Sequence, residues 1–388
     1  MRDYLNWPFF ENHHRVLAQD IDVWADRTLT PLAGKAEGDV DDLCKTLVGE
    51  LSKGGWLDYV VPKAYGGKFE EFDVRSLCII RETLARYLGL ADFTFALQGL
   101  GSGAITLFGT NDQKQKYLPD VRGAKKIAAF ALTEPKAGSD AANLSMTAKD
   151  MGDHYILDGQ KTLISNGGIA DYYTVFARTG EADGAKGISA FLVDADTPGL
   201  EVAERIEVMA PHPLARLKFS GVKVPKENLI GKPGEGFKVA MATLDVFRIS
   251  VAAAALGFAK CGLIKAGKRA KSRKMFGVPM SELQMLQAML AEMVMDVEAS
   301  ALLIYRAAWK RDVKKVCVTK EAAMAKLFAT EAAQRVVDKA VQIWGGMGVV
   351  KGQTVEHLYR EVRALRIYEG ASEVQKIIIA RKFLEGLK

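Results

Sequence analysis

Residues 231–261 have the sequence GKPGEGFKVAMATLDVFRISVAAAALGFAKC, in which a glycine- and proline-rich turn is followed by a long apolar stripe. The stripe returns every three or four residues, the period of one face of an α-helix. We therefore predict a helix that begins after Gly236 and runs as far as Phe276, before Gly277 and Pro279 stop it. The apolar stripe consists of Phe237, Met241, Leu244, Phe247, Val251, Ala254, Phe258 and Cys261.

The same helical period continues downstream. Ser281 followed by Gln284 matches a capping box, which predicts the start of a second long helix, and a third is expected near 320–341. Long amphipathic helices joined by short turns predict an antiparallel bundle. The apolar stripe of the second helix consists of Leu286, Leu290, Met293, Val297, Ala301, Ile304 and Ala308.

Upstream of residue 231 the pattern differs. Short β-rich runs, separated by turn residues, occupy about 126–231, and Asp158-Gly159 within them is a hairpin signal. Such runs suggest a small barrel or sandwich. Before them, from about 12 to 120, the period is again helical. The order is thus helical, β-rich, helical, and we expect domains at 1–121, 122–235 and 236–388.

The composition excludes several classes of protein. With 388 residues, 49% of them hydrophobic, the chain can bury a large core. Its net charge of +6 is spread along the sequence, which argues against nucleic acid as a partner.

No signal peptide is visible, and no run of apolar residues reaches the roughly 18 needed for membrane insertion. We expect a cytoplasmic protein, with four separate thiols in a reducing compartment: Cys44, Cys78, Cys261 and Cys317.

Two motifs have a structural interpretation. Gly99-x-Gly101-x-x-Ala104 matches a dinucleotide-binding pattern, but it lies between helical stretches and not after a strand, so we interpret it as close helix packing. His212 and His357 have no companions at ligand spacing, so no metal site is predicted.

Three polar segments are less ordinary. They are FALTEPKAGSD at 130–140, KTLISNGG at 161–168 and IYEGAS at 367–372. The first two, as loops at strand ends, suit the edge of a flat heterocycle, yet unaided turns explain them equally well. In the third, Glu369 lies between aromatic and small residues, where lost solvation raises a carboxyl pKa towards the range useful for proton abstraction. From this segment alone, a helix N-terminal charge is the favoured interpretation.

Taken together, these segments resemble the acyl-CoA dehydrogenase family from about residue 20 to the C-terminus. The motifs are T-E-P-x-A-G-S-D, I-S-N-G-G, V-P-x-x-N-L-I-G, R-x-x-F-G, Q-x-x-G-G-x-G and I-Y-E-G-x-S. The resemblance implies a multi-domain α+β protein, with an N-terminal helical domain, a central β-barrel and a C-terminal four-helix bundle. It also implies bound FAD and a homotetramer built as a dimer of dimers.

The resemblance also assigns the cofactor contacts. Phe130, Leu132 and Thr133 would line the flavin, Ser139 would contact FAD and the CoA arm, and Ser165 would lie near flavin N5. Leu163 departs from the usual aromatic residue over the flavin, and Ala371 and Glu373 depart from the usual polar residues near it. The contacts to the FAD of a neighbouring subunit would come from Arg273, Phe276, Gln284, Gln342, Gly345 and Gly346.

For the reaction, the resemblance implies α,β-dehydrogenation of an acyl-CoA thioester. Glu369 would remove the α-proton, a hydride would pass to flavin N5, and an electron transfer flavoprotein would accept the electrons. The Glu369 backbone N–H and the FAD ribityl chain would donate hydrogen bonds to the thioester carbonyl. Substrate contacts would come from Ser139, Leu244, Asp245, Phe247, Arg248 and Gly370.

Asp92 is unusual, because a carboxylate at the start of the acyl-pocket helix would be a costly neighbour for an aliphatic chain. An N-cap is the favoured interpretation. The alternative is a second base for cyclic, cyclohexane- or cyclohexene-carboxyl-type CoA esters. Two other functions remain as alternatives: a flavin oxidase, and a non-catalytic acyl-CoA-binding protein.

Overall fold

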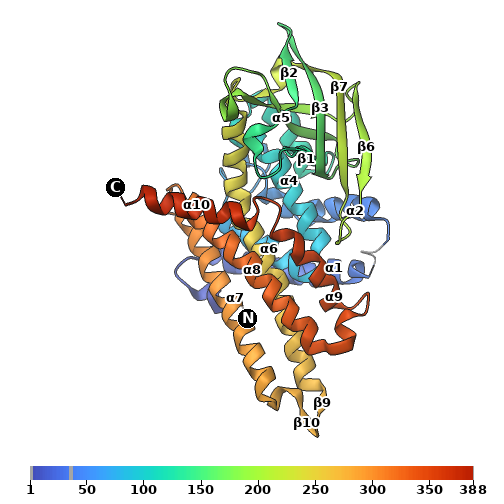
Figure 1. Cartoon of the computed structure of the whole chain (residues 1–388), viewed down its shortest axis with the longest axis vertical. Coiled ribbons are helices and arrows are strands. Elements are labelled where there is room, and N and C mark those ends of the chain that lie inside the picture. Colours follow the sequence, from blue (N-terminus) through green and yellow to red (C-terminus); the bar gives the residue numbers. More distant parts are fainter. Residues whose placement is uncertain (1–2, 35–37, 388) are drawn as a thin grey trace. The chain divides into compact units, whose positions relative to one another are not determined.

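The computed structural model describes residues 3–34 and 38–387, and the chain divides into two compact units (Figure 1). The helical unit comprises Met1–Ala33, Val74–Asp92 and Arg248–Lys388, and the sheet unit comprises Gly34–Asp73 and Phe93–Phe247. The chain passes between the units inside helix α4 (Gly89–Phe108) and inside helix α6 (Gly236–Ser272). The predicted order of helical, β-rich and helical segments is confirmed.

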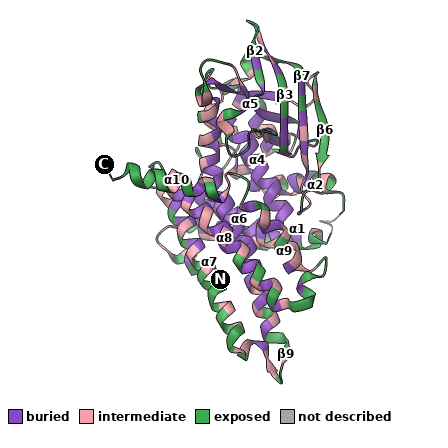
Figure 2. Ribbon diagram, in the orientation of Figure 1, coloured by how far each residue is buried: buried purple, intermediate pink, exposed green. Residues whose placement is uncertain are grey.

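In the helical unit, α8 packs against α7, α9 and α10, and α3 packs against α1 and α7. The α6 helix is buried along most of its length (Figure 2), and on more faces than its single apolar stripe predicts. Besides parts of α4 and α6, the longer elements of the unit are α1 (Asn12–Ala33), α3 (Val74–Tyr87), α7 (Gln284–Asp312), α8 (Thr319–Trp344), α9 (Thr354–Leu365) and α10 (Ser372–Glu385).

The turn between α6 and α7 differs from its prediction. The α6 helix ends at Ser272, and the chain reverses through two short strands, β9 (Lys274–Met275) and β10 (Val278–Pro279). Phe276 and Gly277 between them both have a positive φ, of 51° and 86°. The predicted capping box is wrong, because Leu283 is the N-cap of α7 and provides no side-chain hydrogen bond.

One helix bears on the membrane expectation. By length and composition α6 could cross a membrane, although 78% of its most apolar window is buried inside the protein. The α6 helix contains isolated charged residues that interrupt its apolar run, but the mean hydropathy of its most apolar window is still 1.7. Burial of this extent is typical of a core helix.

The sheet unit is built on a mixed sheet in the order β6-β7-β3-β2-β4-β5-β8, with β1 paired to β4. The β1 strand runs parallel to β4, and β3 runs antiparallel to β7. The strands are β1 (Ala128–Ala131), β2 (Thr147–Asp150), β3 (His154–Ser165), β4 (Tyr172–Arg178), β5 (Ile188–Asp194), β6 (Leu200–Ile206), β7 (Leu214–Pro225) and β8 (Leu229–Ile230), and the unit also holds helices α2 (Val40–Lys53) and α5 (Asn111–Arg122).

The predicted hairpin at Asp158-Gly159 is wrong, because β3 continues through both residues. Gly159 lies at an irregularity in the pairing with β7 and has a φ of 145°. A side chain there would meet Met146 at 2.8 Å, so glycine at this position permits close approach and does not reverse the chain.

The Gly99-x-Gly101 motif packs as predicted. A Cβ atom on Gly101 would lie 2.7 Å from the Ala128 side chain, and one on Gly99 would lie 2.6 Å from Phe247. The Gly101 carbonyl also accepts a hydrogen bond from Thr174 Oγ1 at 2.9 Å. Gly101 thus lets α4 lie directly against the start of β1, and Gly99 lets it lie against α6.

Candidate active site

Glu369 lies in a turn between α9 and α10, and its backbone is strained. Its φ is 54°, and that of Gly370 is 98°, so two successive residues have a left-handed backbone. This conformation costs roughly 1–2 kcal/mol for a residue with a Cβ atom. The surrounding structure must therefore hold the turn in place.

Three buried side chains hold this turn through its carbonyl groups. Lys326 Nζ and Gln375 Nε2 both donate to the Gly370 carbonyl, at 2.7 and 3.0 Å. Arg248 Nε donates to the Glu369 carbonyl at 3.3 Å. These side chains come from α8, α10 and α6, so three helices of the unit fix the position of one residue.

The Glu369 carboxyl group is poorly solvated. Its Oε2 atom is buried and has no hydrogen-bond partner among the described residues. Burial raises the pKa of Glu369, and Asp92 adds to that rise. The cations that oppose it are Arg81, Lys326 and Arg248. A carboxylate with a raised pKa and a free acceptor atom is suited to proton abstraction near neutral pH.

Asp92 forms a buried ion pair with Arg81. Arg81 Nε and Nη2 donate to the two Asp92 carboxylate oxygens at 2.8 and 2.9 Å, and Nη1 donates to Ser250 at 3.0 Å. Although burial alone would lower the pKa of Arg81, Asp92 raises it above its ordinary value. Asp92 lies in the first turn of α4, where its N–H already donates to Leu88, so the N-cap interpretation is wrong.

In the sheet unit, the first two polar segments lie beside each other. The Thr162 N–H donates to the Thr133 carbonyl at 2.9 Å. Lys161, which is fully buried, donates to the Leu132 carbonyl at 3.0 Å and to the Glu134 carboxylate at 2.9 Å. The prediction that these two segments are neighbours is thus supported by direct contacts.

Glu134 closes the loop that follows. Its carboxylate accepts hydrogen bonds from the Ser145 N–H at 2.6 Å and from the Met146 N–H at 3.0 Å. Burial would raise the pKa of Glu134, but Lys161 and these backbone donors lower it. Burial lowers the pKa of Lys161 to about 8, against the pull of Glu134.

A bulge in β3 shapes the I-S-N-G-G segment. The pairing with β7 is interrupted between Lys161 and Ile164, and Leu163 there has a φ of 55° and is 51% exposed. Asn166 also has a positive φ, 60°, and its side chain donates to Ala128 at 2.9 Å. Left-handed residues other than glycine thus occur in both the Leu163 and the Glu369 segments.

The remaining cofactor candidates of this unit lie near these contacts. Phe130 is half-buried on β1, with its ring centroid 4.8 Å from that of Phe176. The hydroxyls of Thr133, Ser139 and Ser165 make no hydrogen bond within the part of the chain that the structure describes. Three hydroxyls therefore remain available to a ligand.

The candidates for a neighbouring cofactor lie at one end of α6. Trp344 Nε1 donates to the Lys265 carbonyl at 3.3 Å, which ties the end of α8 to α6. Phe276 is 88% exposed at the turn after α6. Arg273, Gln284, Gln342, Gly345 and Gly346 are also exposed.

The substrate candidates on α6 have different environments. Leu244 and Phe247 are buried, and the Phe247 ring lies 5.7 Å from that of Phe72, whereas Asp245 is half-buried. Ala371 is the N-cap of α10 without a side-chain bond, and Glu373 is exposed in its first turn.

Three residues at this site were not predicted from the sequence: Arg81, Lys326 and Gln375. Each lies in an ordinary helical pattern, and no local motif shows that it contacts Asp92 or the Glu369–Gly370 turn.

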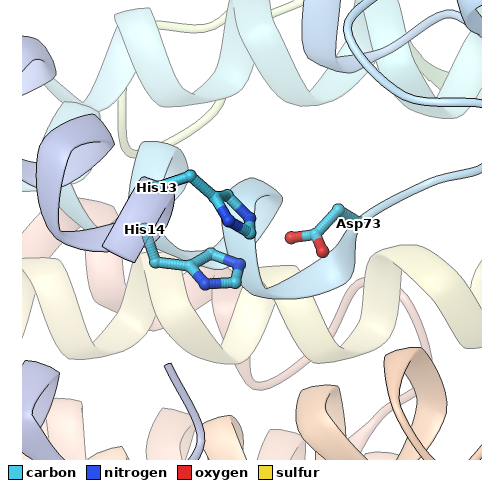
Figure 3. Close-up of side chains that lie close together, drawn as sticks. All are labelled: His13, His14 and Asp73. Carbon is cyan, nitrogen blue, oxygen red and sulfur yellow. The ribbon is translucent and has the colours of Figure 1, made fainter. Parts of the chain in front are cut away.

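Two neighbouring histidines were also not predicted to interact. The ring centroids of His13 and His14 lie 3.8 Å apart at the start of α1 (Figure 3). His14 Nδ1 accepts the Glu11 N–H at 3.1 Å, which accounts for this ring as part of the helix start. Asp73, also labelled in Figure 3, belongs to the sheet unit.

Nearly the whole chain matches known protein domains. Residues 11–124 match the acyl-CoA dehydrogenase N-terminal domain, 129–222 match the middle domain and 234–384 match the C-terminal domain. The 3-(aryl)acrylate reductase of Clostridium sporogenes is 39% identical over 97% of this chain and all of its own length.

Two further proteins add information on partners and cofactor. The caffeyl-CoA reductase-Etf complex subunit CarC of Acetobacterium woodii is 39% identical, over 96% of this chain and 97% of its own. The structure of an acyl-CoA dehydrogenase complexed with FAD from Bacillus anthracis has a TM-score of 0.90 and 30% identity, over 97% of this chain and 67% of that one.

Proposed function

Because the chain belongs to the acyl-CoA dehydrogenase family and is thus an FAD-dependent oxidoreductase, we propose that it dehydrogenates the Cα–Cβ bond of an acyl-CoA thioester with Glu369 as the base. The observation that carries this proposal is the buried Oε2 atom of Glu369, which has no partner among the described residues. A raised pKa and a fixed backbone prepare that atom to accept a proton.

The residues present fit FAD. The partner-free hydroxyls of Thr133 and Ser165 lie on segments that hydrogen bonds join, next to the half-buried Phe130. Flavins offer many ring acceptors and an apolar face, so hydroxyl donors beside an aromatic ring are suitable neighbours. When bound, FAD supplies the acceptor for the hydride that leaves the β-carbon.

The chain's own residues would abstract the proton and bind the thioester carbonyl. The Glu369 carboxylate takes the α-proton. The Glu369 N–H has no acceptor among the described residues, so it is available to the thioester carbonyl, where enolate charge develops. Arg248 and Lys326 hold the backbone that carries both groups.

Three further proposals concern the electron acceptor, the cellular compartment and the oligomeric state. An electron transfer flavoprotein is proposed as the acceptor, supported by the relative named as part of an Etf complex. A cytoplasmic homotetramer is proposed, and the exposure of apolar residues of α7 and its preceding turn supports assembly. These residues are Phe276, Met285, Met295 and Leu302.

A second base at Asp92 for cyclic esters has less support. Both of its carboxylate oxygens accept hydrogen bonds from Arg81, so a proton bound there would break a buried ion pair. We therefore assign proton abstraction to Glu369. An oxidase activity remains the competing reaction on the same scaffold, and rapid oxygen consumption during turnover would distinguish it.

The test is an anaerobic titration of the purified, flavin-loaded protein with straight-chain, aryl and alicyclic acyl-CoA esters. Bleaching of the flavin absorbance by at least one ester is expected, together with loss of bleaching in Glu369→Gln. Two results would contradict the proposal. In one, the protein holds FAD but none of the saturated esters bleaches it. In the other, wild type and Glu369→Gln are bleached equally.

A further inference from the structure

We propose that Lys326 is a positioning residue for the base, which fixes the Glu369–Gly370 turn and supplies a positive charge that favours the deprotonated carboxylate of Glu369. This inference rests on the proposed function of Glu369. It assigns to Lys326 two separable effects, one on the backbone and one on charge.

The burial of Lys326 requires an explanation. Its side chain is fully buried, yet the described residues place no carboxylate within ion-pair distance of its Nζ atom. The buried lysines Lys161 and Lys260 differ, since each has a carboxylate partner at 2.9 Å. A buried charge without a close counter-charge is costly, and a buried group with a strongly shifted pKa is a candidate for a functional role.

The contact of Lys326 shows where that charge acts. Nζ donates to the Gly370 carbonyl at 2.7 Å, one residue after the base. The turn has little freedom on this side, because a Cβ atom on Gly370 would lie 2.3 Å from Gln375 Nε2. Lys326 thus holds the turn against the bundle through α8, while Gln375 holds it from α10.

The charges around both groups make their protonation interdependent. Burial lowers the pKa of Lys326 to about 8, while Glu369 opposes that fall. Arg248 lowers the pKa of Lys326 further, and Glu331 and Glu373 raise it. For Glu369 the other facing charges are Arg81, Arg248 and Asp92, named above. Below pH 8 Lys326 is charged and stabilises the Glu369 carboxylate, and this support fades as the pH rises through about 8.

The experiment compares Lys326→Met and Lys326→Arg with wild type, and uses Lys260→Met as the control. Lys260 is a buried lysine of the same unit that pairs with Glu82 and acts on another part of the core. The readouts are the pH profile of kcat/KM and the pH dependence of the Glu369 carboxyl infrared band. That band is identified as the one that Glu369→Gln removes.

Lys326→Met is expected to move the acid limb and the carboxyl band up by about one pH unit, which lowers kcat/KM about tenfold on that limb. Lys326→Arg keeps the charge, so the acid limb and the carboxyl band should both stay in place. Lys260→Met should lower the melting temperature and move neither limb.

The inference is overturned if Lys326→Met loses activity while the band and the limb stay in place, since that describes a purely structural residue. If Lys326→Met does not fold, Lys326→Gln takes its place, because an amide can still donate to the Gly370 carbonyl without a charge. An unchanged carboxyl band in that variant then overturns the inference. The proposed function and this inference can fail separately. If wild type shows no turnover but Lys326→Met still moves the infrared band, the proposed function is contradicted and this inference stands.

Discussion

Arg81 and Asp92 form a two-pronged ion pair, 2.8 and 2.9 Å long, inside the helical unit, and both side chains are almost completely buried. Asp92 neutralises the arginine, and each also acts on the pKa of Glu369, in opposite directions. The pair therefore contributes to the electrostatic environment of Glu369, the proposed base, as well as to the core.

Replacing Asp92 by Asn is expected to destabilise the protein by about 3–5 kcal/mol, because Arg81 is left as a buried, uncompensated charge. Since Asp92 raises the pKa of Glu369, its neutralisation should lower that pKa and move the acid limb of kcat/KM to lower pH. Thermal unfolding and pH profiles with straight-chain and alicyclic esters measure both effects. A loss of activity confined to the alicyclic esters would instead favour Asp92 as their base.

Replacing Glu369 by Gln should lower kcat about 10²–10⁴-fold, the usual contribution of a positioned acid–base group. FAD content should stay the same, because the amide keeps the size and place of the side chain. Stopped-flow measurement of flavin reduction checks the rate, and the visible spectrum checks the cofactor. Glu385→Gln, at an exposed ion pair with Lys382, serves as the control.

Replacing Lys161 by Met should weaken FAD binding. The substitution leaves Glu134 buried without its cation and removes the bond to the Leu132 carbonyl, so the loop with Thr133 is released. The ratio of FAD to protein after dialysis is the measurement. Lys226→Met removes an exposed ion pair in the same unit and should retain FAD; equal loss in both variants would show that the effect is not local.

Replacing Gly370 by Ala should lower both stability and activity, because a Cβ atom would clash with Gln375 and the φ of 98° disfavours any side chain. Gly352→Ala is a matched control, with a φ of 87° and no atom within 4 Å of the added carbon. Melting temperature and kcat are measured for both. If the two variants behave alike, backbone strain alone is responsible and the clash is not.

Elements with long periodic patterns could be predicted from the sequence, and contacts between distant segments could not. The α6 stripe from Phe237 to Cys261 predicts its helix, because burial of one face repeats along the chain. The hairpin predicted at Asp158-Gly159 was wrong, because the same two residues suit both a turn and a strand bulge.

At the site, Glu369 could be proposed from its motif. Lys326 could not, because it lies 43 positions before Glu369 and no local pattern joins them.

The positive φ of Glu369 has a consequence for how this chain trades folding against chemistry. Glycine would adopt that backbone with less strain, so Glu369→Gly should relax the turn even as it removes the acid. The native residue is thus one that the local backbone disfavours. Improving this protein for heat resistance alone would tend to erase its reactivity at that position.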